Sequence, residues 1–138
     1  MAGTVVLSSD KLYVGASGKY ETRELTILCT GDASDGTIPD TNLCSLVAAD
    51  KPLHGWGLCS IETVPGATGP TDNSDVYLKT ANGTDILEGN GENMLDNAAN
   101  NIIYPPLIPL IVFLTLTLDV DNQSVNSAVY TIIMNLTR

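Results

Sequence analysis

The sequence is poor in basic residues. Among its 138 residues, 6 are Lys or Arg and 16 are Asp or Glu, so the net charge is −10, and no Lys or Arg lies between Thr80 and Thr137. Nucleic-acid binding depends on contacts from Lys and Arg to phosphates, and anionic membrane surfaces attract basic segments. We therefore expect no nucleic acid and no membrane among its partners.

Aromatic residues and histidine are also scarce, with one Trp, one Phe and one His. Sugar-binding sites commonly stack aromatic rings on the sugar, so a glycan-binding module is disfavoured. A serine triad would need His54, and the sequence lacks the G-x-S-x-G pattern of a nucleophile elbow. We expect His54 in a loop or at the surface, and we predict that the protein is not an enzyme.

The three cysteines, Cys29, Cys44 and Cys59, include no close pair. A Cys₃His zinc site with His54 is conceivable, but structural zinc sites usually contain C-x₂₋₄-C pairs. In an extended strand Cys59 and His54 would lie about 17 Å apart, so a nucleophilic pair would need a turn. We expect buried free thiols, no metal ion and no cofactor. An odd cysteine count, and an N-terminus without the basic and apolar regions of a secretory signal, indicate assembly in a reducing cytoplasm.

Acidic residues recur in segments that read as turns. Asp119-x-Asp121-x-Gln123 resembles the start of a calcium loop, but Ser124 and Tyr130 occupy the positions where an EF-hand has Gly and Glu. Asp32, Asp35 and Asp40 could gather a cation, but plain acidic turns are favoured for them. Asp85 and Glu88 could in principle act as acid and base, but a solvated face is favoured for this pair. No catalytic residue is therefore predicted.

Alternating polar and apolar residues predict a protein built from strands. The length indicates one domain, residues 1–138, with residues 1–9 as an N-terminal arm that packs on its own sheet or, alternatively, reaches a neighbouring subunit. Helix is limited to one turn within residues 93–99. We predict an all-β fold, an antiparallel β-sandwich or jelly roll of about eight strands. The expected strands are residues 5–7, 11–16, 19–30, 43–47, 55–64, 75–79, 110–118 and 125–137, with Asn82–Gly83 as a hairpin turn before a return strand at 85–87.

The last two strands have one apolar face each. Residues 102–118 are apolar but contain three prolines and are shorter than the roughly 20 residues of a membrane helix, so a long central strand from Leu110 is expected. A turn at residues 119–124 would pair this strand with 125–137 as the core hairpin. The polar segments 31–41, 66–74 and 88–101 are predicted surface loops, the last of them mobile. The expected inward residues are Leu25, Ile27 and Cys29, then Val112, Leu114, Leu116 and Leu118, then Ala128, Tyr130, Ile132, Met134 and Leu136.

Residues 55–93 resemble a stretch found in small virion structural proteins of tailed bacteriophages. The resemblance covers the middle third of the chain and implies a β-sandwich subunit of a phage particle. It does not imply a position on the head or in the neck and tail, and it supplies no active-site residues. The matching residues are Gly55–Trp56, Glu62–Thr63, Pro65 to Thr68, Pro70 to Asn73, Val76 and Leu78, Asn82–Gly83, and Gly89-x-Gly91.

Together these observations favour a capsid decoration, or cement, protein. Such a subunit would bind the major capsid protein and itself, as a homo-oligomer for which a trimer is favoured, and would be located in the virion after assembly in the host cytoplasm. We expect its contacts in residues 2–9, 31–40 and 66–74. The alternative is a neck or tail component, an adaptor, terminator or tube subunit that forms a ring; an enzyme or glycan-binding module is the third hypothesis.

Overall fold

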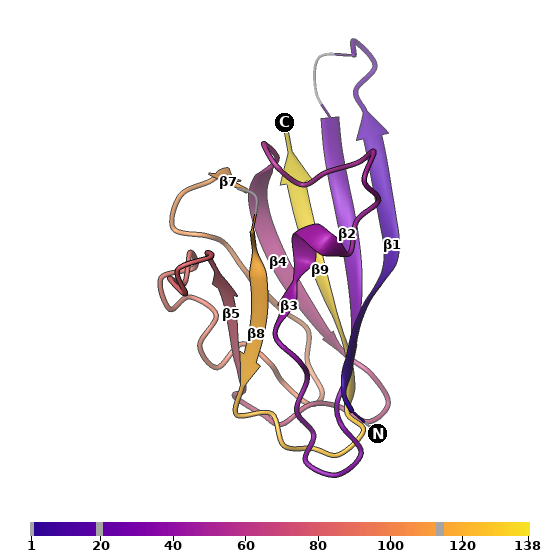
Figure 1. Cartoon of the computed structure of the whole chain (residues 1–138), viewed down its shortest axis with the longest axis vertical. Helices are drawn as coiled ribbons and strands as arrows, with labels where there is room; N and C mark the ends of the chain where they lie inside the picture. Colours follow the sequence, from indigo (N-terminus) through magenta and orange to yellow (C-terminus); the bar gives the residue numbers. More distant parts are fainter. Residues whose placement is uncertain (1, 19–20, 113–114) are drawn as a thin grey trace.

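The chain folds into two antiparallel sheets packed face to face, as a β-sandwich (Figure 1). The computed structural model describes residues 2–18, 21–112 and 115–138. The larger sheet has the order β1-β2-β9-β4-β6, with β7 also pairing with β4, and the smaller sheet has the order β3-β8-β5. The strands are β1 (Thr4–Val14), β2 (Glu21–Thr30), β3 (Thr41–Asn42), β4 (Gly57–Pro65), β5 (Asp75–Lys79), β6 (Asn101–Ile103), β7 (Leu110–Ile111), β8 (Thr117–Asp121) and β9 (Val129–Thr137).

The predicted all-β sandwich is confirmed. The described residues contain one helical element, the short 3₁₀ turn η1 (Leu43–Ser45), and no helix that is long and apolar enough to cross a membrane. No helix forms within residues 93–99. The strand alternation places the expected residues inside, because successive side chains of a strand point to opposite faces. The buried core includes Leu25, Ile27, Cys29, Val112, Leu116, Leu118, Ala128, Tyr130, Ile132, Met134 and Leu136; Leu114 lies outside the described residues.

The expected core hairpin of the last two strands is wrong. β9 lies between β2 and β4 in the larger sheet, with Thr22 opposite Thr137 and Leu58 opposite Leu136, whereas β8 lies in the middle of the smaller sheet. Two strands that each bury one face can pair side by side or face each other across the core. Their alternation is identical in the two arrangements, so the pattern could not distinguish them.

The expected long strand at residues 110–118 is also wrong, because the chain changes sheets within it. β7 pairs with β4 in the larger sheet, and β8 begins at Thr117 in the smaller one. Val112 lies between them, donating its N–H to the Trp56 carbonyl at 2.7 Å. Phe113 and Leu114, which the prediction placed in this strand, lie outside the described residues. β8 then continues through Asp121, so residues 119–121 are strand rather than turn.

Two local predictions need correction, and a third begins outside the described residues. Residues 5–7 and 11–16 belong mainly to one strand, β1, with an irregularity between Leu7 and Ser9, so residues 4–9 of the expected arm pair with β2 of the same chain. Residues 43–47 begin with the turn η1 rather than a strand, because the Asn42 side chain accepts a hydrogen bond from the Cys44 N–H at 3.1 Å. The β2 prediction began at residues 19–20, which lie outside the described residues.

The Asn82–Gly83 turn forms, but the expected return strand does not. Gly83 has φ +83° and donates its N–H to the Thr80 carbonyl at 2.9 Å. The return is limited to an isolated antiparallel bridge between Lys79 and Asp85, with the Ile86 N–H bonded to the Leu78 carbonyl at 2.8 Å. The Asp85 carboxylate also accepts backbone N–H groups from Leu78, Leu87 and Gly89. The polar segment 88–101 is anchored in the core, since it contains the buried side chains Met94 and Leu95 and follows the buried Leu87.

Candidate binding surface

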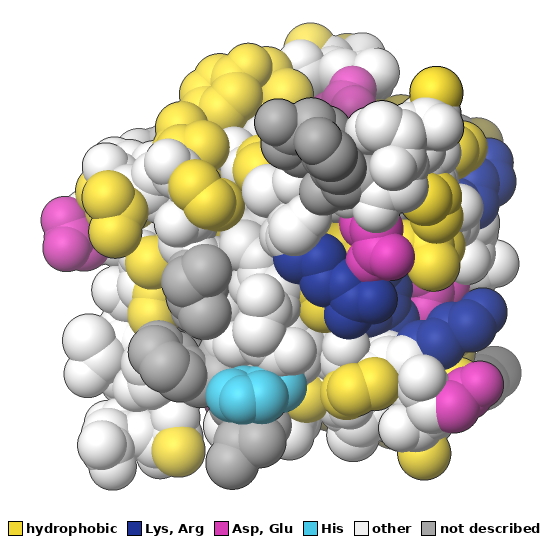
Figure 2. All heavy atoms as spheres, turned by 90° about the horizontal axis from the view of Figure 1, so that it is seen from above, with side chains coloured by type: hydrophobic (Ala, Val, Ile, Leu, Met, Phe, Trp, Pro, Cys, Tyr) yellow, Lys and Arg dark blue, Asp and Glu magenta, His cyan; other side chains and the backbone are white. Residues whose placement is uncertain are grey.

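The cysteine and histidine candidates are separated in the fold. Cys29 is fully buried on β2, and this burial raises the pKa of its thiol to about 12. Cys44 and Cys59 are half-buried, and burial is the main cause of the raised pKa of each thiol. His54 is exposed and is visible in the end view of Figure 2. Among the described residues, no three His, Cys, Asp or Glu side chains are placed to hold a metal ion.

The acidic candidates stabilise local structure. Asp32 accepts the Ser34 N–H at 2.6 Å, and its hydrogen bonds from Ser34 hold the pKa of the Asp32 carboxyl below its usual value. Asp35 accepts the N–H and the hydroxyl of Thr37 at 3.0 and 2.7 Å. Asp40 belongs to a different cluster, so Asp32, Asp35 and Asp40 do not converge on one point.

The residues that resemble the start of a calcium loop, Asp119, Asp121 and Gln123, have separate roles in the structure. Asp119 lies on β8 and pairs with Lys79 of the neighbouring strand β5. Partial burial and the nearby Asp119 carboxylate raise the pKa of Asp40. Asp121 is exposed at the end of β8, and Gln123 is buried with hydrogen bonds to backbone groups. Asp85 is occupied by backbone N–H groups, as described above, while Glu88 is exposed.

Of the three segments predicted to make contacts, residues 31–40 and 66–74 and the first residues of 2–9 converge at one end of the sandwich, whereas residues 4–9 lie in β1. We define the loop end as residues 2–3, 31–40, 66–74 and 122–127; it surrounds the N-terminus at the bottom of Figure 1. Gln123 connects these segments, because its Nε2 donates to the Gly36 carbonyl at 2.6 Å and its Oε1 accepts the Thr71 N–H at 2.8 Å. Ser124 donates its N–H to the Thr71 hydroxyl at 2.9 Å. One buried side chain therefore fixes the two long loops relative to each other.

The N-terminus is part of the same end. A Cβ atom on Gly3 would lie 2.1 Å from the Thr37 carbonyl oxygen, so the backbone preceding β1 lies directly against the 31–40 loop. On the other side, Ser127 donates its N–H to the Asp32 carbonyl at 3.0 Å. The 66–74 loop is joined to β9 by reciprocal bonds of 2.7 Å, from Gly66 to Val129 and from Val129 to Thr68. This packing makes the loop end a continuous surface.

The loop end is acidic. Its segments contain Asp32, Asp35, Asp40 and Asp72 and no Lys or Arg. Asp72 accepts the Asn97 N–H at 2.7 Å, which brings the adjacent turn with Asp96 alongside. Backbone hydrogen bonds from Ala98 and Ala99 hold the pKa of the Asp96 carboxyl below its usual value. Such a surface attracts a basic partner.

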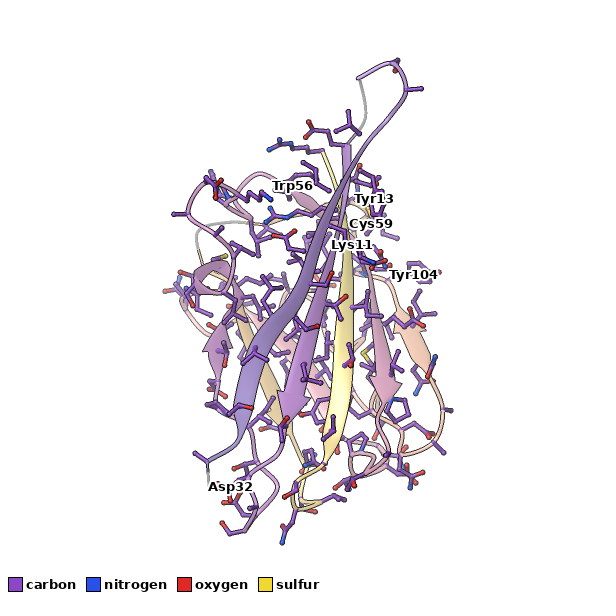
Figure 3. The ribbon with its side chains drawn as sticks, turned by 90° about the vertical axis from the view of Figure 1, so that its right-hand side faces the viewer. Lys11, Tyr13, Asp32, Trp56, Cys59 and Tyr104 are labelled. Carbon is purple, nitrogen blue, oxygen red and sulfur yellow. The ribbon has the colours of Figure 1, made fainter. Side chains whose placement is uncertain are left out.

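The opposite end carries a cluster that the sequence did not reveal. The guanidinium carbons of Arg23 and Arg138 lie 5.4 and 4.4 Å from the centre of the Trp56 ring. With Leu12, Lys51 and neighbouring residues they line a hollow of about 140 Å³. Figure 2 looks onto this end and shows its basic side chains with acidic ones among them, and Figure 3 shows Trp56 and Asp32 at opposite ends of the molecule. Segments distant in sequence supply this cluster, so no local motif could reveal it.

Comparison of the chain with models of protein families, with curated proteins and with solved structures found no significant match.

Proposed function

We propose that the protein is a non-enzymatic structural protein of a bacteriophage virion, a decoration protein that binds and stabilises the shell of major capsid protein. The observation that supports this function is the loop end, where the N-terminus and two long loops form one acidic surface held by the buried Gln123. Loops on a rigid scaffold are a common location for binding surfaces. The resemblance of residues 55–93 to phage virion proteins supports the same proposal.

The proposed mechanism is stabilisation by mass action. A subunit that binds the assembled shell, and not separated capsid subunits, lowers the free energy of the assembled state. An acidic loop end would select basic patches on the outer shell, so binding should weaken as salt rises. The proposal assigns no catalytic step, and the Asp32, Asp35 and Asp85 carboxylates already accept local hydrogen bonds.

The first experiment is co-sedimentation of the purified protein with empty heads assembled without it. Substituting the exposed loop-end residues Ala33→Lys and Ala67→Lys should lower the amount bound at saturation, because these changes add positive charge and bulk to the proposed contact. The matched controls, Ala16→Lys and Ala81→Lys, change exposed residues outside the loop end and should bind like the unmodified protein. Absence of saturable binding, or equal losses in both sets, would contradict the proposal.

The alternative is a neck or tail component, an adaptor, terminator or tube subunit that forms a ring. Large apolar side chains are exposed at both edges of the larger sheet, and contacts through them could close either this larger ring or a decoration trimer. Native mass spectrometry of the purified protein separates the two functions. A trimer, the oligomer that fits three-fold positions on a shell, supports decoration, whereas a hexameric or dodecameric ring supports the neck or tail.

A further inference from the structure

The exposed large apolar side chains are concentrated at the two edges of one sheet. Among the described residues there are eight of them, and four lie on each edge of the larger sheet. Monomeric proteins rarely expose contiguous apolar surface, so its location indicates where a partner binds. The residues are Val6, Leu12, Tyr13 and Val14 on β1, and Ile102, Tyr104, Leu107 and Ile108 on β6 and the segment that follows it.

The β1 edge has unpaired backbone as well as apolar side chains. β1 is 11 residues long and pairs only with β2, so within the described part of the chain its other side has no strand partner. The exposed fractions of Leu12, Tyr13 and Val14 are 46%, 53% and 58%. A long exposed edge of this kind is a template for pairing with another chain.

The opposite edge is short in regular structure but rich in apolar side chains. β6 and β7 pair with separate parts of β4, and the segment between them exposes Tyr104, Leu107 and Ile108. Figure 1 shows β1 and β7 on opposite sides of the molecule. Figure 3 shows Tyr104 at the right-hand border of the view and Tyr13 nearer its centre, beside Cys59.

The two apolar edges lie at the same level along the strands. The register connects Leu12 to Arg23, Arg23 to Leu136, Leu136 to Leu58 and Leu58 to Leu110, straight across the sheet. A lower row connects Asp10 through Leu25, Met134 and Ile61 to Ile103. Residues 10–14 therefore lie level with residues 103–111. A heterologous contact between two different edges closes into a ring when the rotation from one copy to the next completes a full turn without a rise.

Charge at the edges favours contact between unlike edges. Lys11 is exposed on β1, with Glu24 opposite it on β2, while the neighbouring Asp10 is already paired with Arg23. At the other edge Glu62 lies opposite Ile102, and Asn90 donates to the Tyr104 carbonyl at 3.2 Å, which brings the turn containing Glu88 close. No Lys or Arg occurs from Thr80 to Thr137. Contact between two β1 edges would bring lysines together, and contact between two β6 edges would bring acids together; like charges across an interface are unfavourable.

We propose that copies of this chain associate edge to edge, the β1 edge of one subunit against the β6 edge of the next, in a heterologous contact that closes into a ring. This inference names the contact through which the expected homo-oligomer would form. The role of that oligomer in capsid decoration rests on the proposed function. The contact itself is a property of the isolated protein. It leaves the loop end of every subunit free on one side of the ring, because the loop end lies beyond the ends of the strands.

The test uses two variants that each disable one edge. Leu12→Ser with Tyr13→Ser removes apolar surface from the β1 edge, and Tyr104→Ser with Leu107→Ser removes it from the β6 edge. A control, Thr26→Ser with Thr131→Ser, changes the outer face of the larger sheet between the two edges. Native mass spectrometry should give a closed oligomer for the unmodified protein and the control, and monomers for each edge variant, with circular dichroism confirming that every variant is folded.

Mixing the two edge variants distinguishes this contact from the others. Each variant keeps the edge that the other has lost, so an equal mixture should form heterodimers and nothing larger. A symmetric contact between like edges would instead leave one variant able to dimerise alone. A monomeric unmodified protein, assembly of either edge variant alone, or a mixture that stays monomeric would overturn the proposal.

A charge exchange provides a second test that removes no apolar surface. Lys11→Glu alone and Glu62→Lys alone should each weaken assembly, and the protein carrying both changes should regain it. Failure of the double variant to assemble better than both single variants would count against the contact. Because these measurements use no capsid, their failure is separate from failure of head binding: a ring that does not bind heads would contradict the proposed function alone.

Discussion

Arg23 donates hydrogen bonds from Nε and Nη2 to the two carboxylate oxygens of Asp10, at 2.8 and 2.7 Å. The Arg23 side chain is 2% exposed, and it also donates to the backbone carbonyls of Lys51 and Pro52. The pair therefore connects β1 and β2 to the segment that leads to Trp56. It is the most buried of the ion pairs among the described residues.

Replacing Asp10 with Ala should strongly destabilise the fold. The change leaves a buried guanidinium without its charge partner, which costs about 3–5 kcal/mol of unfolding free energy. Urea denaturation measures the loss. The matched control is Glu21→Ala, which removes the partner of the more exposed Arg138 and should cost no more than about 1 kcal/mol. Equal losses for the two variants would show that burial does not determine the strength of this pair.

Replacing Gln123 with Ala should loosen the loop end. The substitution leaves the Gly36 carbonyl and the Thr71 N–H without their partner, and an unsatisfied buried polar group costs about 1–3 kcal/mol. Limited proteolysis should then cleave within residues 31–40 and 66–74 sooner than in the unmodified protein. Asn126→Ala, at an exposed residue of the same segment, is the control. Unchanged cleavage of both loops would mean that Gln123 does not hold them.

Replacing Tyr130 with Phe should stabilise the protein. Within the described part of the chain, the Tyr130 hydroxyl is the one buried side-chain polar atom without a hydrogen-bond partner. Burial, reinforced by the nearby Cys29 thiol, raises the pKa of Tyr130 above its usual value. Removing the hydroxyl should recover part of a desolvation cost of about 1–3 kcal/mol. The unfolding midpoint should rise, whereas Tyr77→Phe, at a partly exposed residue on β5, should leave it nearly unchanged. A lower midpoint for Tyr130→Phe would contradict this account.

Replacing Asp40 with Asn should stabilise the protein at neutral pH and have no effect in acid. Asp40 is exposed, but partial desolvation of its carboxyl group and the nearby Asp119 carboxylate raise its pKa, so the folded protein binds this proton more tightly than the unfolded chain does. Stability contributed by Asp40 is consequently lost as pH rises from the unfolded carboxyl pKa, about 4, through the raised folded value. Denaturation midpoints of the two proteins should coincide below pH 4 and separate above it. The exposed Asp50→Asn is the control, and a constant difference at every pH would contradict the expected linkage.

Periodicity predicted the strand interiors well because it is a local property. Leu25, Ile27 and Cys29 alternate with polar residues on β2, and burial of one face follows from that spacing alone. The change of sheet between Ile111 and Thr117 left no such signal, since both sheets bury apolar side chains on the same core. Neighbours in a sandwich are set by long-range pairing that a single strand does not encode.

The candidate surfaces also combine features that local sequence predicts with features that depend on long-range contacts. Residues 31–40 and 66–74 could be identified as loops from Gly, Pro, Asp and Asn, each of which favours turns for a known reason. Their meeting through Gln123 could not be foreseen, because this residue looked like the end of a calcium-loop motif. The edge surfaces depend on which strands have no neighbour, and strand order must be known before Tyr13 and Tyr104 can be recognised as border residues.

The position of β9 has a consequence for how the protein is made. This strand lies in the middle of the larger sheet, and the Thr137 hydroxyl bonds to the Glu21 carbonyl, 116 positions earlier in the chain. During synthesis, β2 and β4 have no strand to join them until β9 has left the ribosome. Their apolar faces must wait for that event, so closure of the core follows the synthesis of β9, and a nascent chain stopped before β9 would depend on chaperones for its solubility.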